Sequence, residues 1–215
     1  MKRAILLLAL MIGLSGVKSY AQDLPDDVIY SDLMLAARDG QDQRASTLIR
    51  NGADVNLKTN PYGFTALIIA SMWGSDGVTR ILLDNGARIN EKDEQGNTSL
   101  IYASQFGHVE VIRMLLGGSA LINEMNNDGK SALYNASILG YDDIVEMLVE
   151  AKANVNLRTK TGDTALIAAA SWGQTEVVKR LLDAGADKSV RNEKGKTALD
   201  IAREKRHTQI VALLN

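Results

Sequence analysis

Glycine recurs at a constant interval along most of this chain, and this interval constrains the fold more than any other feature of the sequence. Two series keep a spacing of 33 residues: Gly63, Gly96, Gly129, Gly162 and Gly195, and Gly74, Gly107, Gly140 and Gly173. A period between about 20 and 50 residues is typical of proteins built from stacked structural repeats. The sequence therefore predicts a solenoid of similar units.

Each unit also opens in the same way. Two residues after each glycine of the first series comes a hydroxyl residue, then a small residue and then Leu: Thr65-Ala66-Leu67, Thr98-Ser99-Leu100, Ser131-Ala132-Leu133, Thr164-Ala165-Leu166 and Thr197-Ala198-Leu199. The pattern predicts two short antiparallel helices per unit, for example over residues 66–73 and 76–85. Because helices this short are marginal in isolation, we expect apolar residues such as Leu67 and Val78 to pack against their counterparts in the next unit.

The repeated motifs resemble those of the ankyrin repeat, whose pattern runs D-x-x-G-x-T-P-L-H, then two alanines, G-H, an apolar helix and G-A-D-V-N. The chain matches the end of this pattern at residues 51–56 and 184–187 and its middle at residues 107–111. The resemblance covers roughly residues 31–215. It implies an all-α solenoid of about six 33-residue helix-turn-helix units with projecting β-turn fingers, at about 31–59, 60–92, 93–125, 126–158, 159–191 and 192–215.

The chain departs from the family pattern at two places in the unit. The proline and histidine of T-P-L-H are missing, and the histidine position holds Ile68, Ile101, Tyr134, Ile167 and Asp200. Ser119 and Lys152 replace the glycine that closes the second helix. That position should be left-handed, so we expect a residue with a side chain to cost about 1 kcal/mol there.

The first 21 residues have the layout of a secretory signal peptide. Lys2 and Arg3 precede an apolar run that ends at Leu14, and a small-residue cleavage site ends at Ala21. The run is too short to span a bilayer, which needs about 20 residues. We therefore expect export to a bacterial periplasm, with secretion as the alternative, a polar lead-in at 22–30, and no stable membrane insertion after cleavage.

Composition argues against nucleic acid as the partner. Loss of residues 1–21 lowers the count of Lys and Arg from 24 to 21 against 26 Asp and Glu, a net charge of −5. Nucleic acid and anionic lipid select for concentrated Lys and Arg. The chain has no Cys, so disulfides are excluded and stability must come from packing.

The residues with catalytic or metal-binding potential do not form a known constellation. His108 and His207 hold the same position in units three periods apart, which places them roughly 30 Å from each other at about 10 Å per stacked unit. They cannot share a metal ion, and we expect them to be structural. Gly129-Lys130-Ser131 lacks the earlier glycine of a phosphate-binding loop, and no serine lies in a G-x-S-x-G turn. We expect no catalytic residues, no metal and no cofactor.

Large apolar residues recur just before the glycines of the second series. The resemblance implies that the first helices line a concave groove and that the loops form fingers beside it. The candidate partner-binding residues are Met72 and Trp73, Gln105 and Phe106, Ile138 and Leu139, and Ser171 and Trp172, with Tyr62 and Phe64 on one finger. We expect them to form an exposed apolar stripe, which marks an interaction surface; the alternative is that the aromatic rings pack on one another along the groove.

The leading hypothesis from the sequence is therefore a periplasmic, monomeric module that binds a folded, exported protein through its groove and fingers. It would act as an inhibitor or immunity protein, or as an accessory factor, of an exported enzyme. The alternative is a hydrolase with catalytic residues on the finger loops.

Overall fold

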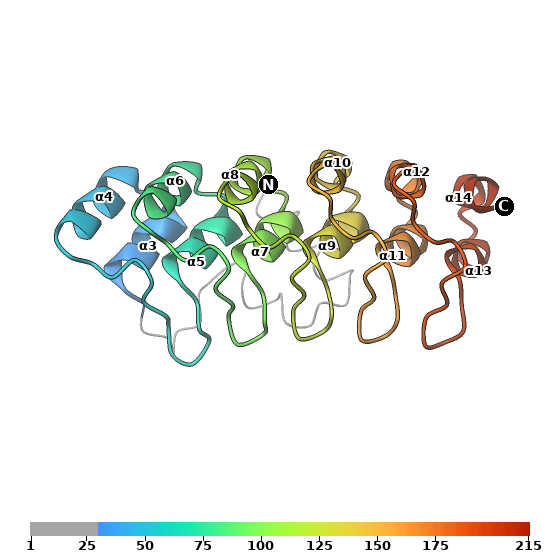
Figure 1. Ribbon diagram of the computed structural model, residues 1–215, viewed down its shortest axis with the longest axis horizontal. Helices are drawn as coiled ribbons and strands as arrows, with labels where there is room; N and C mark the ends of the chain where they lie inside the picture. Colours follow the sequence, from blue (N-terminus) through green and yellow to red (C-terminus); the bar gives the residue numbers. More distant parts are fainter. Residues whose placement is uncertain (1–29) are drawn as a thin grey trace.

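The computed structural model describes residues 30–215, and within that range the chain forms twelve helices in six antiparallel pairs (Figure 1). The pairs are α3 (Asp32–Asp39) with α4 (Asp42–Arg50), α5 (Ala66–Trp73) with α6 (Asp76–Asp84), α7 (Ser99–Phe106) with α8 (Val109–Gly117), α9 (Ala132–Leu139) with α10 (Asp142–Glu150), α11 (Ala165–Trp172) with α12 (Thr175–Asp183), and α13 (Ala198–Glu204) with α14 (Thr208–Leu214). This all-α repeat architecture confirms the predicted fold class.

The helices lie in two layers. The odd-numbered helices pack side by side as an inner layer, the even-numbered helices form an outer layer on them, and the connecting loops project beyond the inner layer as a row of fingers (Figure 1). Inner helices are buried nearly all round, as in α5, whereas outer helices bury one face, as in α6 with Val78, Thr79 and Leu82. This difference follows from position, because each inner helix from α5 to α11 has an inner helix on both sides and an outer helix packed on it.

Each inner helix from α3 to α11 begins after a Ser or Thr cap and ends at a left-handed glycine. At the start of α5 the Thr65 hydroxyl accepts the backbone N–H of Ile68 at 3.2 Å, which satisfies one of the free donors of the first turn. At its end Gly74 adopts a left-handed conformation with φ of 66°, a geometry that glycine enters without steric cost. The other units repeat this arrangement until α13, where Arg206 stands in the glycine position with φ of 61°.

His108 and His207, which follow the inner helices α7 and α13, each contact a glycine of the neighbouring unit. A Cβ atom at Gly74 would overlap the His108 imidazole, whose Nε2 lies 3.0 Å from the Met72 carbonyl oxygen and donates to it in the Nε2–H tautomer. Burial lowers the pKa of His108. His207 lies in the same way against Gly173. Both histidines therefore have the structural position that the repeat predicts.

Hydrogen bonds tie the fingers into one array. Each finger is closed by a backbone bond across its base, at 59–64, 93–97, 126–130, 159–163 and 192–196. Adjacent fingers are then linked from backbone to backbone: Glu94 to Tyr62, Asn127 to Gln95, Lys160 to Asp128 and Glu193 to Thr161, at 2.8–3.0 Å. The finger row is thus a continuous support along the inner layer.

In the fingers that begin at Asp93, Asn126 and Asn192, the side chain of that residue accepts two backbone N–H groups of its own loop. Oδ1 of Asp93 accepts the backbone N–H groups of Gln95 at 3.0 Å and Asn97 at 2.7 Å, and the Tyr102 hydroxyl donates to its Oδ2 at 2.6 Å. Asn126 and Asn192 hold their own fingers through the same two Oδ1 contacts. Because Asp93 is only 6% exposed, burial raises the pKa of its carboxyl group.

The left-handed positions at the ends of the outer helices provide a test of backbone strain. Ser119 and Lys152 have φ of 67° and 68°, which confirms the predicted conformation. We expect Lys152→Gly to raise the free energy of unfolding by about 1 kcal/mol and the thermal midpoint by about 2–4 °C. Gly185→Ala is the matched control: its φ is 84°, a Cβ would meet nothing within 4 Å, and it should lower the midpoint. A lower or unchanged midpoint for Lys152→Gly would contradict this account.

The buried Asp93 predicts a specific pH dependence. Its pKa in the folded chain is above the ordinary 3.8, so the folded state binds the proton more tightly than the unfolded state does. The contribution of Asp93 to stability therefore falls as the pH rises from 3.8 through the raised pKa of the folded chain. Asp93→Asn keeps the two Oδ1 contacts and removes the titration. We expect wild type to gain stability relative to Asp93→Asn as the pH is lowered from about 7 to about 4. Paired thermal unfolding curves measure this difference, and a constant or reversed difference would count against it.

Candidate functional site

The predicted contact residues lie at two places in the structure. Tyr62 and Phe64 are on the finger before α5, and the others occupy the last turns of α5, α7, α9 and α11. The residues before each glycine thus lie at equivalent positions in successive inner helices, which stand side by side in Figure 1.

The expected exposure of three of these residues is wrong. Phe64 is fully buried, Met72 is 5% exposed and Ile138 is 9% exposed. Phe64 is covered because its ring stacks on Tyr62 at 5.9 Å and meets the edge of Tyr102 at 6.4 Å. Met72 and Ile138 are each followed by the last helical residue, and consecutive helical side chains point about 100° apart. One residue of each pair therefore turns toward the neighbouring units while the other borders the groove.

What remains accessible is a narrower strip, which we call the apolar row: Trp73, Phe106, Leu139 and Trp172. The first three are half-buried, whereas Trp172 is 40% exposed. Tyr62, Gln105 and Ser171 are also half-buried. Trp172 of α11 is therefore the most exposed residue of the row.

Aromatic packing covers part of Phe106, the second residue of the row. Tyr102 stacks on Phe106 with ring centroids 6.3 Å apart, and Phe106 lies 6.4 Å from the His108 ring. With the contacts of Phe64, these rings form a continuous chain from the finger at 59–64 to the end of α7. At this end of the groove, the rings do pack on one another, as the alternative interpretation of the sequence expects.

The C-terminal part of the groove contains an open pocket of about 310 Å³. Its walls come from α9, α11, α13 and the two fingers at 159–163 and 192–196, and Trp172 is among the lining residues. Tyr134, at the family's histidine position, also lines it, and burial raises the pKa of its phenol. The pocket therefore coincides with the place where the apolar row is most exposed.

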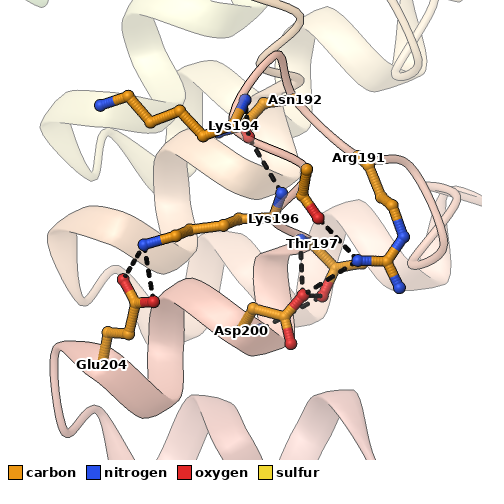
Figure 2. Close-up of polar contacts among 8 residues, drawn as sticks. Arg191, Asn192, Lys194, Lys196, Thr197, Asp200 and Glu204 are labelled. Carbon is orange, nitrogen blue, oxygen red and sulfur yellow. Dashed lines mark hydrogen bonds and ion pairs between the residues drawn. The ribbon is translucent and has the colours of Figure 1, made fainter.

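Charged side chains surround this pocket. Lys196 Nζ lies 2.6 Å from a carboxylate oxygen of Glu204, and Lys194 reaches to the same side of the loop (Figure 2). Lys205, which follows α13, lines the pocket as well. Sequence reasoning did not single out Lys194 and Lys205 as site residues. Their 33-residue register with Thr161 and Trp172 could have placed them beside the groove.

No three His, Cys, Asp or Glu side chains within residues 30–215 lie close enough together to hold a metal ion. Over the same residues, no helix has the length and apolar character needed to cross a membrane.

The comparisons with known proteins agree with this geometry. A family described as "Ankyrin repeats (3 copies)" matches residues 33–123, 95–159 and 151–215. A protein of Treponema pallidum (strain Nichols), described as containing ankyrin repeats, is 39% identical over 64 residues, which are 30% of this chain and 22% of that protein. The chain thus matches about a fifth of this relative's length. Because the three overlapping matches together cover residues 33–215, the chain belongs to the ankyrin-repeat family, whose repeats form a protein–protein interaction module.

Proposed function

We propose that this protein is a periplasmic binding module that docks a folded, exported protein in the groove between its inner helices and its fingers. The family is typically a non-enzymatic interaction scaffold, and the proposal places the contact at one part of that scaffold. Within this role it would either inhibit an exported enzyme or assist one as an accessory factor.

The observation that carries the proposal is the exposed indole of Trp172. At 40% exposure this side chain leaves a large apolar surface in water that folding of α11 does not require, since the core face of α11 is formed by Ala165 to Ala170. Trp is among the residues that contribute most to binding at protein interfaces. Its place beside an open pocket is typical of an anchor for a partner side chain.

Rigidity of the groove supports docking of a folded partner. The finger row is held by backbone hydrogen bonds between adjacent loops, so little conformational entropy is lost when a partner is bound. Asp93, Asn126 and Asn192 are occupied in holding the fingers, which leaves these polar groups committed to loop structure rather than to catalysis.

The periplasmic location rests on residues 1–21, which lie outside the described residues. We expect the chain produced in a bacterial host with these residues to be recovered from the periplasmic fraction. Its intact mass should correspond to cleavage after Ala21, and a chain that lacks residues 2–21 should stay in the cytoplasmic fraction. Recovery of uncleaved, full-length chain in the cytoplasm would contradict the export proposal.

Partner capture tests the binding surface. We expect Trp172→Ala to weaken capture of a partner from an envelope extract by about 2 kcal/mol or more, measured by titration of the immobilised chain. Leu121→Ala is the matched control, because Leu121 is 54% exposed but lies in the loop after α8, away from the apolar row. If Trp172→Ala captures the partner as well as wild type does, the apolar row is not the docking site.

A further inference from the structure

We propose that the pocket at the C-terminal end of the groove binds an acidic peptide segment of the partner, with an apolar side chain against Trp172 and carboxylates at Lys194 and Lys205. The inference rests on the proposed function and specifies the chemistry of the partner at that same surface.

The volume of the pocket suits a short segment of a partner chain. Its volume of about 310 Å³ lies at the lower end of the range for ligand-binding clefts. Apolar lining comes from Ile167 and Ala168 of α11 and Ile201 of α13. Ile167 and Ala168 are only 2% and 4% exposed, so the apolar surface open to one side chain comes mainly from Ile201 and the Trp172 indole.

The pocket lining carries three lysines, Lys194, Lys196 and Lys205, against the two carboxylates of Asp163 and Glu204, a net charge of +1. The Glu204 carboxylate is bound by Lys196, and Asp163 accepts from the Asn192 amide at 2.8 Å and the Thr161 hydroxyl at 3.0 Å. Lys194 and Lys205 are exposed, and the ion pairs found within residues 30–215 include neither of them. A ligand with carboxylate groups would therefore form ion pairs with the free ammonium groups of Lys194 and Lys205.

This positive end contrasts with the rest of the chain. Residues 192–215 carry five Lys and Arg against three Asp and Glu, whereas residues 30–191 carry 16 against 20. A local excess of one sign on a molecule of opposite overall charge directs an oppositely charged segment to that place. The asymmetry favours an acidic segment at the last unit over the other positions along the groove.

The 33-residue register also predicts how far apart the apolar and the acidic residue should lie along the bound peptide. Lys205 occupies, in the last unit, the position that Trp172 and Leu139 occupy in the two units before it. An ammonium group thus follows the indole at a distance of one stacked unit, roughly 10 Å. An extended peptide rises about 3.3 Å per residue, so the apolar residue and an acidic residue should be about three positions apart.

The polarity of an end unit does not account for these two lysines. A terminal repeat needs polar residues on the face where no neighbour follows. Lys194 and Lys205 instead line a pocket that α9 and α11 also line, so they border the groove shared with preceding units. Their position there is consistent with a binding role.

A peptide selection tests the inference directly. Random octapeptides displayed on phage are selected on the purified chain, and the enriched sequences are resynthesised with a fluorophore for anisotropy titration. We expect enrichment of peptides that combine Asp or Glu with Trp, Phe or Leu about three residues away. The double variant Lys194→Glu, Lys205→Glu should bind these peptides at least about tenfold more weakly than wild type. Trp172→Ala should also lower the binding affinity about tenfold or more.

The matched control changes the same charge at a different place. Lys152 and Lys160 are exposed and outside the pocket, so Lys152→Glu with Lys160→Glu should bind the selected peptides as wild type does. No enrichment of acidic peptides, or equal binding by the Lys194 and Lys205 double variant, would overturn the inference. So would equally effective displacement of the peptide by a single-stranded oligonucleotide, because the pocket would then be a general anion site. If partner capture still depends on Trp172 in any of these cases, only the chemistry assigned to the partner is wrong and the binding function stands.

Discussion

Stacking of neighbouring units is the constraint on which the rest of this structure depends. Each unit contributes two helices of seven to nine residues, too short to be stable alone. The inner helices α5, α7, α9 and α11 become stable because both flanks are covered by equivalent helices and a third side by the outer layer. Close approach at the junctions requires glycine, as at Gly74 against His108. A unit therefore contributes to stability only through its neighbours.

The finger row turns this stack into a shaped surface. The loops are joined by backbone bonds from each finger to the next, and side chains such as Asp93 and Asn126 close each loop from inside. The fingers are thus held by bonds between loops, and in one unit also by the Tyr102 hydroxyl of α7, which donates to Asp93.

The two ends of the groove differ because their side chains differ at equivalent positions. At the N-terminal end, the Phe64, Tyr102 and Phe106 rings contact one another, and Trp73 and Phe106 are half-buried. At the C-terminal end, the position after Trp172 in the register holds Lys205 rather than a ring, and the indole stays 40% exposed beside a pocket. The same backbone therefore offers a closed aromatic surface at one end and an open, positively charged one at the other.

The sequence by itself determined the period, the helix pairs and the left-handed positions at Ser119 and Lys152, because these depend on local conformation repeated in step. It also placed the apolar row at equivalent positions. Only the tertiary structure decided which of those residues are accessible: Phe64, Met72 and Ile138 are buried, whereas Trp172 is not. Exposure depends on side chains from adjacent units, as Phe64 is covered in part by the Tyr102 ring of the next unit. The direction of each side chain and the neighbour that covers it are set by packing between units, which a one-dimensional pattern does not contain.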